Sequence, residues 1–241
     1  MQNMTQILDW DTNVFGYKVA RILPACLTHV ELEQAIDYLK TQDVKLIFWA
    51  SDSADQPSQL AAQQCHGFLA DRKTTYWRQL DNITISPNNH IPQLYQQLEP
   101  SGDLITLALE SGNYSRFQND PRIGRALFEK IYTLWITNST NGQIADGVLV
   151  TADQQTLTGM VTLGEKNNRG DIGLLAVAEN QRGAGLGVSL VQAALQAFQQ
   201  KGYSIAQVVT QQDNLPACRL YEKCGFSVEK VENFYHFWLT K

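Results

Sequence analysis

Three glycines, Gly183, Gly185 and Gly187, lie within five consecutive positions, after an apolar run and before a long amphipathic stretch. Glycine permits backbone conformations that other residues avoid, and it lets backbone N–H groups approach a ligand closely. The N-terminus of the helix expected to follow adds partial positive charge. The segment therefore predicts a cradle for phosphate groups that needs no lysine.

The type of phosphate site follows from what the segment lacks. No Gly-Lys-Ser or Gly-Lys-Thr follows the glycines, which argues against a P-loop. A dinucleotide-binding loop would have the spacing Gly-x-Gly-x-x-Gly, whereas Ser189 lies where a later glycine could be. The strand expected at residues 205–209 is followed by Thr210 and not by an acidic residue, which also argues against a dinucleotide.

A second group of residues follows downstream, made of Asn214, Ala217 and Tyr221 and then Gly225 and Phe226. Asn214 should begin a helix, and Tyr221 lies seven residues later, two turns on and on the same face. One interpretation is structural, with Asn214 as an N-cap and Tyr221 as a packed aromatic residue. The position of the group after the glycine loop favours a functional role.

Together the two segments resemble the motifs of the GCN5-related N-acetyltransferases (GNAT). The spacing Arg182-x-x-Gly185-x-Gly187 is similar to the family's acyl-CoA pyrophosphate loop, and residues 214–226 are similar to its Asn-x-x-Ala-x-x-x-Tyr-x-x-x-Gly-Phe motif. The resemblance implies acetyl-CoA as co-substrate, with Tyr221 near the sulfur as the catalytic residue. It also implies that the cofactor is bound by Leu175, Ala176, Val177, Arg182, Gly183, Ala184, Gly185, Leu186, Gly187, Asn214 and Ala217.

In this chemistry an amine attacks the thioester carbonyl, and a backbone N–H near residues 175–177 can stabilise the oxyanion. The leaving thiolate takes a proton from Tyr221, which acts as general acid. The attacking amine must be neutral, so a base or a chain of waters is needed. Glu165, Asp171 and His236 are candidates for the base, although each fits a solvated loop or strand residue better.

The acceptor side resembles a narrower group, the TDP-fucosamine (dTDP-4-amino-4,6-dideoxygalactose) acetyltransferases. The similar segments are residues 9–16, 115–121 and 171–175. A nucleotide sugar needs a cation or amides for its diphosphate and aromatic rings for its base or deoxy face. The candidates for substrate binding are Tyr114, Arg116, Phe117, Asn13 and Phe15.

The resemblance thus implies acetyl transfer from acetyl-CoA to the amino group of a nucleotide-linked amino-deoxysugar by direct attack. Several alternatives stay open. The acceptor could be a peptide, a polyamine or another small amine, and the chain could be a non-catalytic acyl-CoA-binding module. Residues 114–117 could equally be a surface loop that caps the helix after them.

The elements that must position these residues follow from hydrophobic periodicity. Strands are predicted at residues 16–23, 44–50, 74–80, 147–151, 157–163, 171–177, 205–209, 227–231 and 234–239. Helices are predicted at residues 31–40, 58–65, 103–110, 123–138, 188–201 and 215–224, with a loop at residues 111–121. This order fits an α/β (mixed-sheet α+β) class. The resemblance implies a GNAT fold, with an N-terminal half-GNAT-like α/β subdomain at residues 1–88 and an acetyltransferase domain at residues 89–241.

The first subdomain is interpreted as a degenerate copy of the last third of the chain. With Gly67 set on Gly225, Tyr76 falls on Phe234 without a gap. The copy has no glycine loop, and Gln63 takes the position of the catalytic tyrosine, so this half should not be catalytic. Chance similarity of two short strand–helix–strand units is the alternative.

Composition excludes several classes. With 24 acidic and 19 basic residues the net charge is -5, and no run of Lys or Arg suggests a nucleic-acid protein. Residues 183–200 are uncharged, but four glutamines and a one-sided apolar stripe argue against a membrane span. None of the four cysteines forms a Cys-x-x-Cys pair, so no metal site is expected. No signal peptide is visible, so we expect a cytoplasmic protein. The expected partner is a small amine, and a homodimer is left open.

Overall fold

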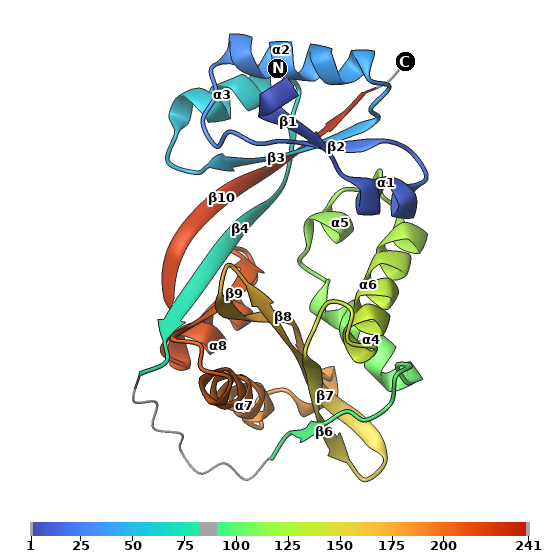
Figure 1. Ribbon diagram of the computed structural model, residues 1–241, viewed down its shortest axis with the longest axis vertical. Coiled ribbons are helices and arrows are strands. Elements are labelled where there is room, and N and C mark those ends of the chain that lie inside the picture. Colours follow the sequence, from blue (N-terminus) through green and yellow to red (C-terminus); the bar gives the residue numbers. More distant parts are fainter. Residues whose placement is uncertain (1, 82–90, 240–241) are drawn as a thin grey trace.

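The computed structural model describes residues 2–81 and 91–239, and the strands of that part of the chain form one mixed sheet (Figure 1). The strand order is β1-β2-β3-β10-β4-β9-β8-β7-β6-β5. The strands are β1 (Thr5–Ile7), β2 (Val19–Ile22), β3 (Leu46–Asp52), β4 (Phe68–Gln79), β5 (Gln93–Leu94), β6 (Gly147–Asp153), β7 (Thr156–Lys166), β8 (Arg169–Val177), β9 (Ile205–Gln211) and β10 (Ser227–Trp238). The predicted mixed α/β class is confirmed. The boundary between residues 88 and 89 lies outside the described residues, and the division there stays a prediction.

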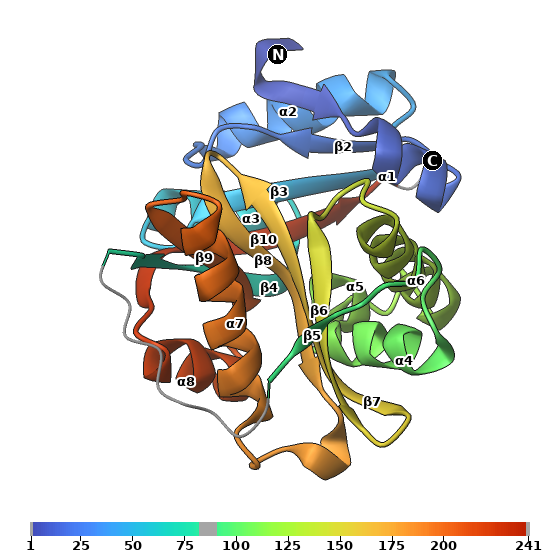
Figure 2. The same ribbon diagram turned by 60° about the horizontal axis from the view of Figure 1, so that its bottom comes forward.

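Helices cover both faces of this sheet. In the described residues they are α1 (Asp9–Phe15), α2 (His29–Thr41), α3 (Gln56–Gln64), α4 (Gly102–Ser111), α5 (Arg116–Asn119), α6 (Arg125–Thr140), α7 (Leu186–Gln200) and α8 (Leu215–Lys223), with short 3-10 helices at Gln2–Met4 and Glu179–Gln181. Figure 2 shows α7 and α8 on one side of strands β6 to β9, and α4 and α6 on the other. None of these described helices is both long enough and apolar enough to cross a membrane.

Alternate strand residues enter cores on opposite faces, as strand geometry requires. In β7, Val161 packs in the core with α7 and α8, whereas its neighbour Met160 packs in the core with α4 and α6. In β3, Ile47 packs with α2 and α3, whereas Phe48 packs with α1, α5 and α6. The sheet therefore separates two layers of helices.

The two last predicted strands, at residues 227–231 and 234–239, are wrong as separate elements because β10 is continuous through them. The polar residues between them suggested a turn, but Glu232 pairs in register with Asp52 on β3 and with Lys73 on β4. Its carboxylate lies 3.1 Å from the Lys73 ammonium. A salt bridge with a neighbouring strand thus lets a charged residue occupy a central strand.

Two helices were absent from the sequence prediction. The loop predicted at residues 111–121 contains α5, whose N-cap Ser115 accepts the N–H of Gln118. The helix α1 has no side-chain cap at its start and ends at Gly16, which adopts a left-handed conformation (φ 77°). Both helices are short, so their apolar periodicity is too brief to be recognised.

The predicted sequence repeat is also a structural repeat, in which β3, α3 and β4 correspond to β9, α8 and β10. Each element of the second unit has the length of its counterpart and lies 159 residues after it. Both helices have proline in the first turn and a polar N-cap, Asp55 or Asn214, which accepts the N–H three residues later. The agreement of lengths and caps argues against chance similarity.

The two units exchange their last strands. β10 of the second unit lies between β3 and β4 of the first, and β4 lies between β10 and β9 (Figure 1). The register is symmetric, because Asp52 pairs with Glu232 as Gln211 pairs with Lys73. Lys73 and Glu232 also pair with each other. An approximate two-fold axis therefore passes through this pair.

The structural alignment of the repeat differs by one residue from the alignment predicted from the sequence. His66 adopts a left-handed conformation (φ 57°) at the position that Gly225 (φ 78°) takes in the second unit. Gly67 therefore corresponds to Phe226, and Tyr76 corresponds to Tyr235. The prediction aligned two glycines because glycine is the usual residue after a helix, but here histidine takes that place.

This shift changes which residue replaces the tyrosine in the first unit. The carbonyl of Tyr221 accepts the N–H of Phe226 (3.0 Å), and the carbonyl of Ala62 accepts the N–H of Gly67 (2.7 Å). Ala62, and not Gln63, is therefore the counterpart of Tyr221. Ala62 is fully buried and has no hydroxyl group, so the first unit has no proton donor at this position.

Candidate active site

Strands β8 and β9 are parallel but paired at only one end. Residues 170–172 pair with residues 206–208, and the pairing stops there. A bulge in the pairing of β8 with β7 follows directly. Residues 173–177 and 209–211 are thus not paired with each other, and both segments line one cleft.

The cleft has a volume of about 910 Å³ and brings together most of the predicted site. The predicted residues that line it are Leu175, Ala176, Val177, Arg182, Gly183, Gly185, Leu186, Gly187, Asn214, Ala217, Tyr221, Tyr114, Arg116 and Phe117. Ala184, Asn13 and Phe15 are described by the structure but do not line it.

The glycine loop forms one end of the cleft. Gly183 (φ 84°) and Gly185 (φ 87°) adopt left-handed conformations, and a Cβ added to either would meet no atom within 4 Å. Gly185 is the N-cap of α7 and supplies no side-chain cap. The first N–H groups of α7 therefore lack a capping side chain, as an anion-binding helix start requires.

Cationic side chains surround this end. Arg182 donates from Nε to the carbonyl of Val177 (3.1 Å) and from its terminal nitrogen to Glu110 (3.1 Å), which ties the loop to β8 and α4. Arg219 and Lys223 are exposed on α8 and line the same cleft. An open backbone cradle flanked by cations fits the polyphosphate part of an acyl-CoA.

Asn214 and Tyr221 reach the cleft from α8. The Oδ1 atom of Asn214 accepts the N–H of Ala217 (3.3 Å), so its interpretation as an N-cap is confirmed. The Tyr221 ring packs against Phe226 and Tyr76, with ring centroids 5.9 Å apart in both pairs. Burial raises the pKa of the Tyr221 hydroxyl, so the group stays protonated at neutral pH and can donate a proton.

At the other end, Arg116 lies among aromatic rings. Its guanidinium carbon lies 4.1 Å, 4.5 Å and 4.8 Å from the ring centroids of Phe117, Phe234 and Phe48. Its Nε atom is buried without a hydrogen-bond partner among the described residues. Cation–π contacts with three rings therefore hold this guanidinium in place.

Two carboxyl groups balance the Arg116 charge. Burial lowers the pKa of Arg116, while Asp71 and Asp11 oppose that shift. Burial raises the pKa of Asp71 to about 6, against the opposing effect of the Arg116 guanidinium and N–H. Sequence reasoning missed Asp71, which also lines the cleft. The sequence offered no signal for it, because Asp71 lies in a charged stretch of the N-terminal subdomain, which was expected not to be catalytic.

A family model described as the acetyltransferase (GNAT) family matches residues 115–226. This segment contains the glycine loop, both diverging strands and Tyr221. The chain contains a GNAT acetyltransferase domain. The family uses acetyl-CoA, so the family and the co-substrate predicted from the sequence are both confirmed.

Comparisons with individual proteins extend this result. The spore coat polysaccharide biosynthesis protein SpsD of Bacillus subtilis (strain 168) is 26% identical over 138 residues, covering 57% of this chain and 47% of that protein. The chain spans about half the length, or less, of the curated relatives it matches.

Solved structures show the same fold. A GCN5-related N-acetyltransferase from Sphaerobacter thermophilus is 13% identical with a TM-score of 0.61, covering 97% of this chain and 76% of that one. A tandem GNAT protein from the clavulanic acid biosynthesis pathway is 14% identical with a TM-score of 0.54, covering 92% and 76%. The predicted GNAT fold is therefore confirmed.

The glycine loop of the GNAT domain gives a first prediction. Replacing Gly185 by alanine should weaken acetyl-CoA binding about 10-fold, because a side chain disfavours the left-handed conformation by ~1–2 kcal/mol and displaces the loop. Gly202 provides a matched control at the other end of α7, since it has φ 86° and equal space for a Cβ but does not line the cleft. Calorimetry should show wild-type affinity for Gly202→Ala, and equal affinities of the two variants would contradict the prediction.

None of the three candidates for the base lies in the cleft of the GNAT domain. Glu165 accepts a hydrogen bond from the Tyr203 hydroxyl (3.0 Å), and Asp171 accepts one from Gln207 (2.7 Å). His236 is fully buried beneath the sheet surface. None of the three side chains therefore lines the cleft, although Asp171 lies on β8 just before the strands diverge.

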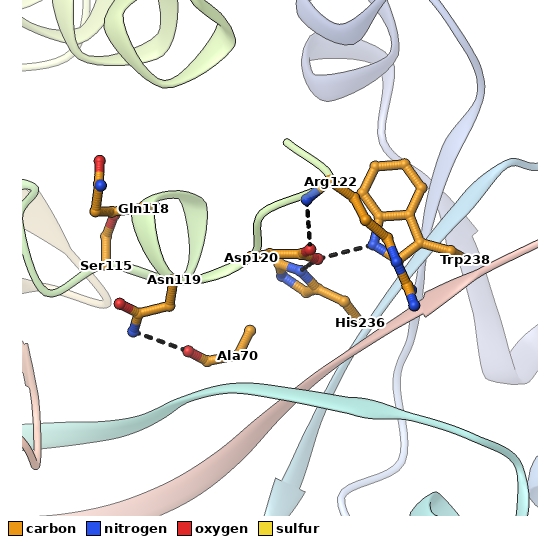
Figure 3. A network of polar contacts seen from close by, with 8 residues as sticks. All are labelled: Ala70, Ser115, Gln118, Asn119, Asp120, Arg122, His236 and Trp238. Atoms are coloured by element: carbon orange, nitrogen blue, oxygen red, sulfur yellow. Dashed lines mark hydrogen bonds and ion pairs between the residues drawn. The ribbon is translucent and has the colours of Figure 1, made fainter. Parts of the chain in front are cut away.

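His236 belongs to a polar network that fixes the acceptor end of the domain (Figure 3). The same Asp120 oxygen accepts from His236 Nδ1 (2.7 Å) and from Trp238 Nε1 (2.8 Å), and the other oxygen accepts the N–H of Arg122 (3.1 Å). Asn119 donates to the carbonyl of Ala70 (3.0 Å). These bonds tie the end of α5 to β10 and β4.

The remaining predicted substrate residues lie elsewhere. Asn13 lines a separate hollow with Lys18 and Lys45, and Phe15 is buried against Phe117 in the core beneath α5. The segment around them resembles the TDP-fucosamine acetyltransferases, but neither residue lines the cleft, and only Phe15 packs against it from behind.

Proposed function

We propose that the chain transfers the acetyl group of acetyl-CoA to the amino group of a small molecule, and that this acceptor is a nucleotide-linked amino-deoxysugar. The observation that carries acetyl transfer is the single cleft that joins the glycine loop, the diverging strands and Tyr221. The cationic loop end suits the polyphosphate of the co-substrate. The aromatic and acidic end suits an amine on an apolar deoxysugar face.

The residues of the cleft have distinct tasks. When bound, acetyl-CoA supplies a thioester whose carbonyl carbon forms the new C–N bond while its C–S bond breaks. A backbone N–H group near residues 175–177 stabilises the charge that develops on the carbonyl oxygen. The Tyr221 hydroxyl donates the proton that the leaving sulfur requires.

The support for a sugar acceptor comes from two sources. One relative is named for spore coat polysaccharide biosynthesis. Two aromatic side chains, Tyr114 and Trp135, line the acceptor end and offer faces against which a deoxysugar can pack. The balanced charge of Arg116 makes it a poor diphosphate ligand, so we assign diphosphate binding to no side chain.

A panel of acceptors tests the proposal. The purified protein with acetyl-CoA should acetylate TDP-4-amino-4,6-dideoxygalactose with a higher kcat/KM than a free amino sugar, spermidine or a peptide amine, as followed by mass spectrometry. Preferential acetylation of spermidine or peptide would contradict the sugar acceptor and support the alternative small-amine acetyltransferase. Binding of acetyl-CoA in calorimetry without acetylation of any amine would support a non-catalytic module.

A further inference from the structure

We propose that Asp71, contributed by the first repeat unit, is the base that takes the proton from the acceptor amine. This inference rests on the proposed function, and it gives the amine a proton acceptor that the GNAT domain of residues 115–226 does not itself supply. The argument starts from where the carboxyl group is held.

Asp71 is fixed beside the open end of the diverging strands. It lies on β4 in register with Phe234 of β10, and the carbonyl of the next residue, Arg72, accepts the N–H of Gln212 just after β9 (2.7 Å). On its other side, the carbonyl of Ala70 accepts the amide of Asn119 from α5 (Figure 3). The backbone around Asp71 is therefore tied to both walls of the acceptor end.

The carboxyl group has an oxygen available for a ligand. Asp71 lines the same cleft as Tyr221. Its Oδ1 atom is buried and has no hydrogen-bond partner among the described residues. A buried carboxyl oxygen without a partner costs free energy unless a ligand or water satisfies it. An ammonium or amine group of the acceptor provides that partner.

The charges around Asp71 set the protonation state that this role needs. Burial raises its pKa to about 6, while Arg116 on α5 and Lys73 on β4 lower it and Asp213 after β9 raises it. The buried Tyr132 hydroxyl on α6 also faces this group, and burial keeps it protonated. At pH 7 the carboxyl group is therefore mostly ionised, but its pKa is close enough to neutrality to accept and release a proton.

With Asp71 as the base, every proton and every bond of the reaction is accounted for. The acceptor ammonium gives one proton to Asp71, which releases it to solvent. The C–N bond forms as the C–S bond breaks, and the sulfur takes its proton from Tyr221. The second proton of the attacking nitrogen restores the Tyr221 hydroxyl through water. Acetyl-CoA and an ammonium thus yield an amide, CoA and one proton.

Arg116 acts on this site as a positioning residue. Its guanidinium is held by three aromatic rings and opposes the rise in the Asp71 pKa. Without this charge, the Asp71 pKa would rise further, and a smaller fraction of the carboxyl group would be ionised and able to act as a base at neutral pH. The cation predicted to bind a diphosphate is therefore better explained by its effect on Asp71.

The test compares Asp71→Asn with Asp171→Asn. Asp171 is a matched control because it is also a partly buried strand aspartate with a raised pKa, yet it does not line the cleft. We expect Asp71→Asn to lower kcat about 100-fold, a typical loss for a base, with little change in the KM for acetyl-CoA. Acetyl-CoA binding by calorimetry should match the wild type for both variants and shows that they fold.

The pH profile adds a measurement on the wild-type protein. The acid limb of kcat/KM should have an apparent pKa near 6, stay there for acceptor amines of different basicity, and disappear in Asp71→Asn. If the acid limb moves with the pKa of the amine, or persists in Asp71→Asn with wild-type kcat, Asp71 is not the base. Either result leaves the proposed function standing. Failure of the wild type to acetylate any amine overturns the proposed function and this inference together.

Discussion

Replacing Tyr221 by phenylalanine is expected to lower kcat by about 100-fold or more while the affinity for acetyl-CoA stays close to wild type. The hydroxyl is the only group removed, and the ring contacts with Phe226 and Tyr76 are retained. Because burial raises the pKa of Tyr221, the wild-type hydroxyl carries its proton throughout the neutral range. The loss should therefore appear as reduced turnover and not as a shifted acid limb.

Tyr76→Phe is the control for this substitution. Tyr76 is also buried and packs directly on the Tyr221 ring, but its hydroxyl donates to Glu222 (3.1 Å) and it does not line the cleft. Steady-state kinetics with the acetylated amine should show near wild-type kcat for Tyr76→Phe. If Tyr221→Phe kept wild-type turnover, the leaving thiolate would have to take its proton from another source, such as water.

Replacing Asp120 by alanine is expected to lower the free energy of unfolding by about 3–5 kcal/mol. The substitution leaves His236 Nδ1, Trp238 Nε1 and the N–H of Arg122 without their acceptor (Figure 3). The first of these lies in a fully buried side chain, where an unpaired donor is costly. Urea denaturation followed by circular dichroism measures the change.

Two further variants separate the network from general surface effects. Asp120→Asn keeps an oxygen acceptor and should lose less stability than Asp120→Ala. Asp146→Ala removes an exposed ion pair with Lys201 and should change stability by about 1 kcal/mol or less. Equal losses for Asp120→Ala and Asp146→Ala would contradict the importance of the buried network.

The pH dependence of stability has a defined sign at this network. Burial lowers the pKa of His236 below its ordinary value of 6.5, so the unfolded chain binds a proton that the folded chain does not. Stability contributed here is present above pH 6.5 and is lost as the pH falls below it. Burial opposes the ionisation of Asp120, but hydrogen bonds from His236 and Trp238 lower its pKa overall. Its own contribution is therefore present above its ordinary pKa of 3.8 and is lost as the pH falls below that value.

Local patterns predicted the cofactor end of the site because its residues are close in sequence. The glycine loop lies directly between β8 and α7, and Tyr221 lies within one short helix, so spacing alone places them. The same local reasoning assigned Asn13 and Phe15 to the substrate, although neither lines the cleft. Their segment packs behind the cleft, which a one-dimensional pattern does not reveal.

The acceptor end required information that the sequence does not display locally. Asp71 reaches the cleft because β4 pairs with strands from the other repeat unit, more than one hundred residues away along the chain. Pairing between such distant segments depends on the exchange of strands between the units. The one-residue shift in the alignment of the repeat also cannot be predicted from the sequence. Only the left-handed backbone conformation of His66 shows that this residue corresponds to Gly225.

The exchange of strands also affects how the chain can fold as it is synthesised. β3 and β4 leave the ribosome early, but β10, the strand that lies between them, is the last strand of the described chain. Until then both strands present open edges, which are prone to pair with other chains. Asp71 lies on one of those edges, so the acceptor end can form only after translation has passed β10.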